Sequence, residues 1–365
     1  MYNVAIIGCG RISHKIAEGI AKNNDRMKLV VLCDPIEEKM FETEKTYNKK
    51  MRIEATLSKY KNYKEILNQN KIDIAIISTE SGYHEEIGLY FLENGVNLIV
   101  EKPLAMSIEG AQKLVDIAKK NNLKLAASHQ NRFNYPIQLL KKAIKENRLG
   151  KIFNGMARIL WTRDDNYYLQ APWRGTWALD GGTLMNQCIH NIDLINWMMD
   201  DEIDTVYAQT SNYIRNIEAE DYGVILIRYK SGKIATIEGS AIIYPKNLEE
   251  TLTVTGEKGT VVIGGMAVNK INTWRVDGDN EQEYLSIDCG DPNSVYGYGH
   301  EALYKDFVDA LDENREPLVN GKAGLEAVKI ILAAYKSQKT GLPIKISKFN
   351  EFFTIDMEKK DVKYL

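Results

Sequence analysis

The N-terminal third of the chain alternates short apolar runs with helical patterns. A helical pattern follows each of the runs NVAII, KLVVLCD, DIAIIST and NLIVEKP, at residues 3–7, 28–34, 73–79 and 97–103. Strict alternation of strand and helix predicts parallel βαβ units, whose strands are buried on both faces. The chain is therefore expected to begin with an α/β domain built on a parallel sheet.

A glycine motif stands between the first predicted strand and a helix beginning near Ile12. It reads Gly8-Cys9-Gly10-Arg11-Ile12-Ser13. Gly8 permits a tight turn, Gly10 lets the backbone approach a pyrophosphate, and the helix N-terminus supplies amide donors. Ser13 replaces a third glycine and is expected to loosen the helix slightly against the strand. The motif in this context predicts a dinucleotide site that includes Gly8, Gly10, Arg11 and Ile12.

Asp34 ends the second predicted strand. A carboxylate about 20 residues past the glycines can accept both ribose hydroxyls and repels a 2′-phosphate. The sequence therefore predicts NAD rather than NADP as the cofactor.

Further polar residues follow the next strands, at the sheet edge where open α/β folds bind ligands. Thr79 and His84 follow one strand, and Glu101-Lys102-Pro103 end another. Pro103 restrains Lys102 to an extended conformation. We expect Thr79, His84, Glu101 and Lys102 to line the cofactor site, although His84 taken alone reads as a helix N-terminal or packing histidine rather than a catalyst.

Length and composition limit the remaining classes. A chain of 365 residues suggests two domains, and a net charge of −3 from well-mixed signs does not favour nucleic acid as a partner. The first residues run into a strand without a leader pattern, and no apolar run is long enough to span a bilayer, so the expected location is the cytoplasm. Dispersed cysteines predict reduced core thiols and no metal site; they are Cys9, Cys33, Cys188 and Cys289.

The second half of the chain changes to the two-residue alternation of antiparallel strands. Ser231-Gly232 and Glu257-Lys258 read as hairpin turns. The pattern predicts an α+β domain with an open, mostly antiparallel sheet. We expect a Rossmann domain at 1–125, a substrate-binding and oligomerisation domain at 126–346, and a tail at 347–365. An exposed apolar sheet face predicts a homodimer or homotetramer.

The segment 182–197, GTLMNQCIHNIDLINW, is apolar except for a polar stripe. On one helix the four- and three-residue spacing of Asn186, His190 and Asp193 places them on the same face. Such a stripe requires internal hydrogen-bond partners or a cavity.

These features together resemble the glucose–fructose oxidoreductase, inositol dehydrogenase and MocA (Gfo/Idh/MocA) family. The resemblance rests on Gly8-x-Gly10, Asp34, the Glu101-Lys102-Pro103 tripeptide and the helix carrying His190, and it runs from about residue 2 to residue 346. Within the family, the runs 161–197 and 295–311 are most similar to the UDP-N-acetylglucosaminuronic acid 3-dehydrogenases of bacterial surface-polysaccharide pathways.

The resemblance implies hydride transfer from C3 of a nucleotide sugar to NAD⁺, giving a 3-keto product for a partner aminotransferase. It also implies a frequent cis bond before the proline of the tripeptide, and an acidic residue four positions before the histidine. This chain has Asn186 there, which puts in doubt a mechanism that needs a carboxylate at that position.

Lys102 and His190 are the expected proton-handling groups. One would accept the hydroxyl proton and the other would donate a hydrogen bond, and the sequence does not assign the two roles. Asn186 would orient the substrate or Lys102, and Asp193 would brace the helix. The alternative is that His190 is a hydrogen-bonded core histidine. His129 is expected to be structural, and His300 is expected to start a helix as a neighbour of its cap.

An anionic substrate requires cationic and aromatic partners. The loop before the site helix carries Arg163 and Arg174 among tryptophans and tyrosines, and Arg132 follows the last Rossmann strand. Arginine forks suit diphosphate and carboxylate, so these three arginines are predicted to bind substrate together with Lys102, Asn186 and His190. The alternative for these arginines is a surface loop with solvated charges. The alternative functions for the protein are an inositol or simple sugar dehydrogenase or NAD-dependent glycosidase of the same fold, and a non-catalytic NAD and sugar sensor.

Overall fold

A computed structural model describes residues 1–290, 297 and 299–357. Val295, Tyr296 and Tyr298 of the 295–311 run, and residues 358–365 of the predicted tail, lie outside the described residues. The chain forms two compact units, each made from several chain segments. The first comprises Met1–Met106, Gly110–Ser128 and His300–Leu325, and the second Ser107–Glu109, His129–Gly299 and Glu326–Leu365.

The first unit is built on a six-stranded sheet in the order β3-β2-β1-β4-β5-β6. All five strand pairs are parallel. The order reverses between β1 and β4, which makes the carboxyl ends of these strands the switch point where such sheets bind ligands. This confirms the predicted Rossmann sheet, whose strands are β1 (Tyr2–Ile7), β2 (Met27–Cys33), β3 (Ser58–Tyr60), β4 (Ile74–Ile77), β5 (Asn97–Val100) and β6 (Leu125–Ala127).

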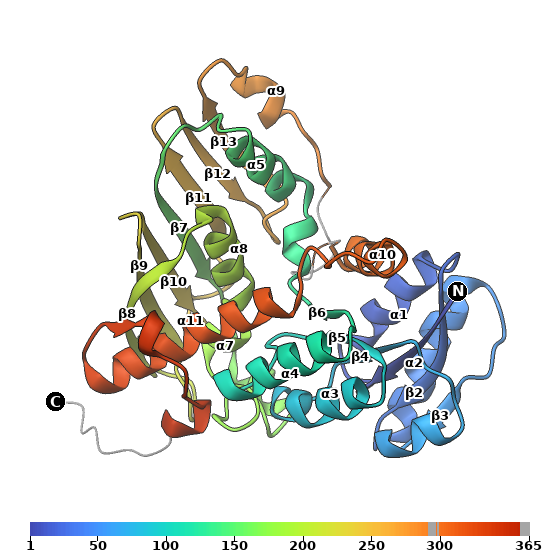
Figure 1. Cartoon of the computed structure of the whole chain (residues 1–365). Helices are drawn as coiled ribbons and strands as arrows, with labels where there is room; N and C mark the ends of the chain where they lie inside the picture. The colour runs from blue at the N-terminus through green and yellow to red at the C-terminus, as the bar shows by residue number, and fades with distance from the viewer. Residues whose placement is uncertain (291–296, 298, 358–365) are drawn as a thin grey trace. The chain divides into compact units, whose positions relative to one another are not determined.

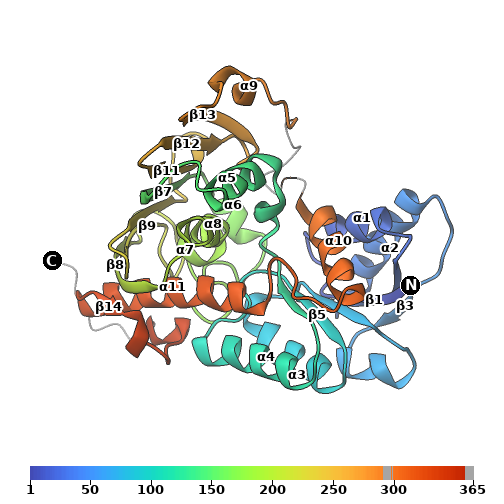
Figure 2. The same cartoon turned by 45° about the horizontal axis from the view of Figure 1, so that its top comes forward.

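Helices cover both faces of this sheet. In Figures 1 and 2, α3 and α4 lie side by side on one face, and α1 and α2 lie on the other. The apolar strand runs are buried on both sides for this reason. The bounds are α1 (Ser13–Lys22), α2 (Glu37–Met51), α3 (His84–Glu93) and α4 (Ile108–Lys120), with short 3₁₀ turns at Tyr63–Asn68 and Ser81–Tyr83.

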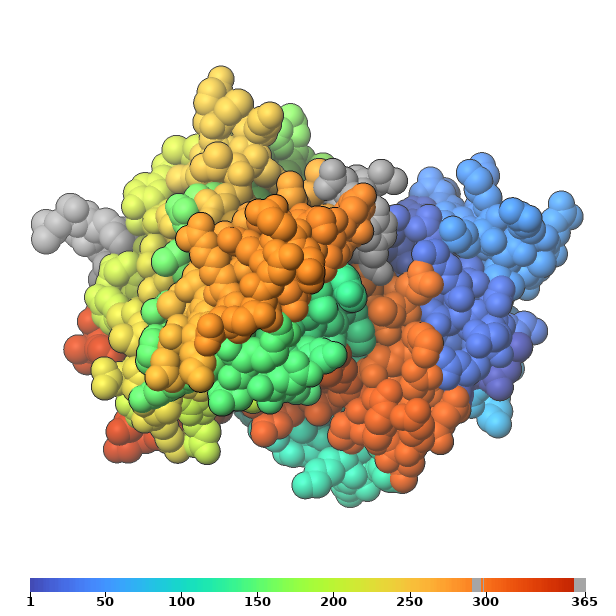
Figure 3. All heavy atoms as spheres, turned by 90° about the horizontal axis from the view of Figure 1, so that it is seen from above, coloured from blue at the N-terminus to red at the C-terminus, as the bar shows by residue number. Residues whose placement is uncertain are grey.

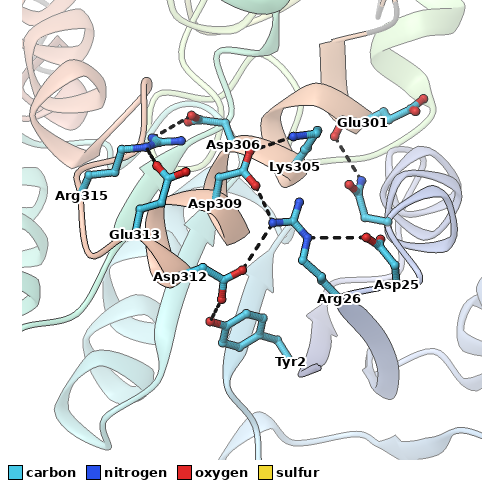
Figure 4. A network of polar contacts seen from close by, with 11 residues as sticks. Tyr2, Asp25, Arg26, Glu301, Lys305, Asp306, Asp309, Asp312, Glu313 and Arg315 are labelled. Carbon is cyan, nitrogen blue, oxygen red and sulfur yellow. Dashed lines mark hydrogen bonds and ion pairs between the residues drawn. The ribbon is translucent and has the colours of Figure 1, made fainter.

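Helix α10 (Gly299–Asp312) returns to the first unit although it follows the whole second sheet in sequence. Its Tyr304 ring packs on Gly19 of α1, where an added Cβ would lie 2.6 Å from the ring. Arg26 pairs with Asp309 and Asp312, and Tyr2 donates to Asp312 (Figure 4). In Figure 3 the orange residues of α10 lie against the blue N-terminal residues. The domain division predicted from sequence, which runs on to residue 346, does not anticipate this return.

The second unit is built on an eight-stranded sheet in the order β13-β12-β11-β7-β10-β9-β8-β14. Among the strand pairs described in this sheet, only β7 and β10 are parallel. The sheet is open and mostly antiparallel, as predicted, and the two-residue hairpin turn at 257–258 between β11 and β12 is confirmed. Ser231-Gly232 also lies in a hairpin turn, between β9 and β10, but the pairing of Arg228 with Ile234 makes this connection longer than the two residues predicted. The strands are β7 (Ile152–Leu160), β8 (Ile203–Ser211), β9 (Tyr222–Tyr229), β10 (Ile234–Ser240), β11 (Glu249–Gly256), β12 (Gly259–Gly264), β13 (Lys270–Val276) and β14 (Ile344–Lys345).

Helix α8 (Ile189–Met199) covers one face of this sheet (Figure 1). Gly155 of β7 allows the close approach, because a Cβ there would lie 2.4 Å from Ile195 of the helix. The other helices are α5 (Tyr135–Lys145), α6 (Asp165–Leu169), α7 (Thr183–Asn186), α9 (Glu281–Leu285) and α11 (Gly321–Thr340), with 3₁₀ turns at Gln130–Phe133, Ile346–Lys348 and Thr354–Met357. None of the helices described is long and apolar enough to cross a membrane.

The segment 182–197 is not one helix, so the predicted single stripe is wrong in this detail. Helix α7 ends at Asn186 and α8 begins at Ile189. The amides of Gln187 and Cys188 both donate to the Thr183 carbonyl, and the helical bonding restarts from the Cys188 carbonyl. The Cys188 sulfur sits over Gly239 of β10, only 2.4 Å from where a Cβ would be. This contact with the sheet fits a break at that point.

Candidate active site

The glycine motif lies at the carboxyl end of β1. Gly8 has φ +93°, and a Cβ on it would lie 2.6 Å from the backbone of Ser78 and Thr79. Glycine is therefore required at this position by the protein itself. A Cβ on Gly10 would meet no protein atom within 4 Å. The open space at Gly10 fits the close approach of a bound pyrophosphate, which is the role predicted for it.

Ser13 and Asp34 tie this loop together. The Ser13 hydroxyl donates to the Gly10 carbonyl at 2.7 Å and lies 2.9 Å from the Thr43 hydroxyl of α2. Ser13 thus links the start of α1 to the glycine loop and to α2, where a looser packing of α1 was expected. Asp34 is 7% exposed and accepts from the amides of Cys9 and Ile36. These bonds fix the carboxylate at the end of β2, where it fits a ribose. Arg11 is exposed and Ile12 half-buried beside it.

His84 is a structural link between two loops of the predicted cofactor site. Its side chain is 1% exposed, with Nδ1 2.7 Å from the Pro103 carbonyl and Nε2 3.2 Å from the Thr79 carbonyl. Burial lowers the pKa of His84 although both carbonyls act in the opposite direction. A neutral ring carries one N–H and can donate to only one of these two carbonyls, so His84 joins the loop after β4 and the loop after β5 through one hydrogen bond and one close packing contact. Its predicted contact with the cofactor stays a prediction.

The Glu101-Lys102-Pro103 tripeptide follows β5, and its Lys102–Pro103 bond is cis, as the resemblance implies. Glu101 is 8% exposed and Lys102 is half-buried. His300 of α10 approaches the Glu101 carboxylate, with Nε2 3.8 Å from Oε1. Burial alone would raise the pKa of Glu101, but His300, Lys102 and Ser128 outweigh it and hold this pKa below its usual range. Glu101 is a buried anion next to Lys102.

In the second unit, the three polar groups of the segment 182–197 have separate surroundings. Asn186 donates to Asp180, His190 lies edge-on to His129 with ring centroids 5.8 Å apart, and Asp193 pairs with Arg132. Internal partners therefore account for much of a polar stripe in an apolar segment. Asp193 braces α8, as expected.

Asn186 belongs to a chain of hydrogen bonds that reaches the arginine-bearing loop. Asp180 is 2% exposed, accepts from Asn186 and accepts from the Gly175 amide at 2.8 Å. Gln187 Nε2 donates to Asn186 Oδ1 and to the Tyr167 hydroxyl, each at 3.0 Å. A carboxylate thus stands beside the asparagine at 186. Sequence reasoning missed Asp180, because no spacing rule connects residues 180 and 186 across a loop.

The guanidinium groups of Arg163 and Arg174 both lie over the Tyr167 ring. Their guanidinium carbons lie 5.3 and 4.3 Å from its centroid, and Arg174 donates to the Tyr167 hydroxyl at 2.6 Å. Arg174 is half-buried and makes no ion pair with any carboxylate among the described residues, and its buried Nε has no hydrogen-bond partner there. A half-buried cation without a counter-ion favours an anionic ligand.

Arg132, also predicted to bind substrate, is 6% exposed. Its Nε and Nη2 donate to the two oxygens of Asp193 at 2.7 and 2.6 Å, and its guanidinium lies 4.8 Å from the Trp197 ring. The structure gives this arginine a bracing role on α8. Direct contact with substrate stays a prediction.

No metal centre is evident among residues 1–290, 297 and 299–357, where no three His, Cys, Asp or Glu side chains could together hold an ion. All four cysteines are free thiols, and three of them are buried.

Glu220 supports the start of α7 and carries a pH-dependent prediction. Its Oε1 accepts from the Leu184 amide and the Tyr335 hydroxyl, and burial raises its pKa from 4.5 to about 8. Because the folded-state pKa is raised, the stability from this group is complete below about pH 4.5 and is lost as the pH rises through 8.

We therefore expect wild-type stability to fall between pH 5 and pH 8 relative to Glu220→Gln, by at least about 1.4 kcal/mol, the free energy of one pKa unit. Urea unfolding of both proteins at the two pH values measures the difference. Equal pH dependence in the two proteins would contradict the assignment. Glu218→Gln is a suitable control in the same loop.

Comparisons with known proteins agree with this arrangement. The model for the "Oxidoreductase family, NAD-binding Rossmann fold" (GFO_IDH_MocA) matches residues 2–129, and the model for the C-terminal alpha/beta domain of the same family matches residues 141–346. A curated relative, myo-inositol 2-dehydrogenase of Thermotoga maritima, is 24% identical over 94% of this chain and 98% of its own.

Two solved structures are similar over nearly the whole chain. The WlbA dehydrogenase of Bordetella pertussis, in complex with NADH and UDP-GlcNAcA, is 32% identical, with a TM-score of 0.82 over 94% of this chain and 98% of its own. The WlbA dehydrogenase of Chromobacterium violaceum, with the same two ligands, is 32% identical, with a TM-score of 0.83 over 94% and 95%.

Proposed function

The chain belongs to the Gfo/Idh/MocA oxidoreductase family and is an NAD-dependent sugar oxidoreductase, and from this premise we propose that it oxidises C3 of UDP-N-acetylglucosaminuronic acid. The product would be the 3-keto sugar, formed in the cytoplasm for surface-polysaccharide biosynthesis. The observation that carries the proposal is the 32% identity, across 94% of the chain, to two dehydrogenases solved with NADH and UDP-GlcNAcA.

The arginines on Tyr167 support an anionic substrate. Arg174 has no carboxylate partner among the described residues, and Arg163 lies over the same ring. A uronate joined to a diphosphate carries the charge that such a pair of guanidinium groups binds. An uncharged polyol would leave Arg174 half-buried without a counter-ion.

Lys102 and His190 are the proposed proton-handling groups. Bound NAD⁺ would accept the hydride, held by the loop of Gly8 and Gly10 and by Asp34 at its ribose. One of the two side chains would take the hydroxyl proton and the other would donate a hydrogen bond to the oxygen as charge develops there. Asn186, oriented by Asp180, would position the sugar.

Substrate screening tests the proposal. Purified protein is mixed with NAD⁺ and UDP-N-acetylglucosaminuronic acid, UDP-N-acetylglucosamine, myo-inositol or free sugars, with and without 2-oxoglutarate as an added keto acid to reoxidise NADH. We expect turnover only with the nucleotide uronate, and NMR of the product should show a carbonyl at C3. No nicotinamide response to the uronate in either arm would contradict the proposal.

The second candidate is an inositol or simple sugar dehydrogenase. It is favoured by the myo-inositol 2-dehydrogenase of Thermotoga maritima, which matches over 94% of the chain. In the same screen this function predicts turnover with myo-inositol or a free sugar, and no dependence on the UDP group. An Arg174→Ala variant separates the two, since it should raise the KM for a uronate and leave a polyol unaffected.

The cofactor preference can be tested through Asp34. Asp34→Asn removes the charge and keeps an oxygen that can accept from the Cys9 amide. Charged hydrogen bonds contribute about 1.5–3 kcal/mol, so the Kd of NADH should rise at least about tenfold. Repulsion of a 2′-phosphate should weaken, so NADPH should gain relative to NADH.

Fluorescence titration with NADH and NADPH gives both Kd values without any sugar. The exposed Asp25→Asn is the matched control in the same unit. Unchanged selectivity in Asp34→Asn would refute the ribose contact.

We also propose that the protein forms a homodimer or homotetramer through the sheet face opposite α8. Met156, Leu226 and Ile234, on the neighbouring strands β7, β9 and β10, are 46%, 43% and 40% exposed in the single chain. A second copy packed on this face would remove them from water. Light scattering after size exclusion should give a mass above that of one chain, and Leu226→Glu should lower it.

A further inference from the structure

His300 is placed against Glu101 by the packing of α10 on the Rossmann unit. At the start of α10, Lys22 pairs with Glu301 and Asn23 donates to the Glu301 carbonyl at 3.2 Å. Farther along, Arg26 pairs with Asp309 (Figure 4). The position of His300 is therefore set by the same fold that positions β5. Sequence reasoning treated His300 only as a residue near a helix cap.

The surroundings of the Glu101 carboxylate are buried and polar. His300 is 5% exposed, Ser128 and Tyr304 are fully buried, and Glu101 itself is 8% exposed. Glu101 Oε1, His300 Nε2 and the Tyr304 hydroxyl have no hydrogen-bond partner within the described residues. The charged or titratable groups that interact electrostatically with Glu101 are Lys102, His84 on α3, and His300 and Tyr304 on α10. Apart from Lys102, none of these groups has a role in the proposed reaction.

A buried carboxylate needs a partner to stay ionised. Burial raises the pKa of Glu101, and His300 is the strongest of the groups that lower it, ahead of Lys102 and Ser128. The attraction between Glu101 and Lys102 is mutual, so an ionised Glu101 favours the ammonium form of Lys102. An ammonium donates hydrogen bonds and cannot accept a proton.

We infer that His300 is a positioning residue, which holds the Glu101 carboxylate ionised beside Lys102 and thereby keeps Lys102 as a hydrogen-bond donor. The catalytic role of Lys102 in this inference rests on the proposed function. The effect of Glu101 and His300 on the protonation of the Lys102 amine does not.

The test is a double-mutant cycle with Glu101→Gln, His300→Ala and the double variant. Acetic anhydride labels unprotonated amines, and mass spectrometry reports the labelling rate of Lys102 at pH 8 without any sugar. Glu101→Gln should accelerate labelling up to about tenfold, the effect of one pKa unit on the amine fraction. His300→Ala should accelerate it about threefold, since Glu101 then gains a proton more readily. The double variant should match Glu101→Gln alone.

Controls separate this role from a merely structural one. Lys305→Ala alters an exposed ion pair on the same helix and should leave Lys102 labelling unchanged. His300→Gln keeps a donor and should restore most of the wild-type rate if His300→Ala is poorly folded. For turnover, His300→Ala should lower kcat with little change in KM, and should change the pH profile of kcat.

The inference is overturned if Lys102 labels at the wild-type rate in either single variant, or if the two effects multiply in the double variant. Because labelling needs no substrate, this failure is distinct from failure of the UDP-uronate proposal. If only the UDP-uronate proposal fails, the screen shows no turnover with the uronate, while the labelling rates in the double-mutant cycle keep the expected pattern.

Discussion

Turnover is expected to fall at least about 10²-fold when Lys102 is replaced by methionine, since positioned acid–base groups contribute roughly 10²–10⁴ to rate. Methionine keeps the length and apolar stem of the side chain and removes all of its hydrogen-bond donors. The fold around β5 should persist, because Lys102 is only half-buried and follows the strand. Steady-state kinetics on the substrate identified by the screen measures the loss.

Lys102→Arg tells the two possible roles of Lys102 apart. Arginine donates hydrogen bonds and is never a base at neutral pH. If Lys102 is a donor, the arginine variant should retain at least about ten times the activity of the methionine variant; if Lys102 is the base, both should be equally inactive. Lys28→Met, at an exposed position of β2, is the control. A Lys102→Met protein with near-wild-type turnover would remove Lys102 from the mechanism.

The parts of the fold fixed by local chemistry could be read from the sequence. Gly8 needs a positive φ and lies against the backbone of Ser78 and Thr79, and the motif around it identified the first βα turn correctly. The alternation of residues in β9 and β10 and the Ser231-Gly232 turn likewise determined a hairpin. In each case the determining contacts lie within a few residues or in adjacent strands.

Features determined by distant contacts could not be read in this way. Helix α10 returns to the first unit through pairs such as Arg26 with Asp309, which are 283 residues apart. The break after Asn186 coincides with a cysteine seated on Gly239 of another strand. The partners of Asn186 and Glu101, which are Asp180 and His300, come from a loop and from α10. No local sequence pattern marks Asp180 or His300 as a partner, and only the tertiary fold brings each of them to its contact.

The pair of Arg132 and Asp193 carries the largest expected effect on stability. Both side chains are almost fully buried, at 7% and 2% exposure, and they are joined by two hydrogen bonds. Removing one partner of a buried pair leaves an uncompensated charge, which costs about 3–5 kcal/mol. Arg132→Met should therefore lower the free energy of unfolding of the second unit by this amount, as measured by urea denaturation.

Replacing both partners separates the contribution of the pair from the cost of an isolated charge. In Arg132→Met/Asp193→Leu no charge is left buried, and apolar side chains of similar volume should recover most of the stability. Activity should not recover equally, because Asp193 lies three residues after His190 on α8 and the pair fixes that helix. A double variant as unstable as Arg132→Met would show instead that the stacking of Arg132 on Trp197 is the main contribution. Recovery of both stability and kcat would mean that the position of His190 does not depend on this pair.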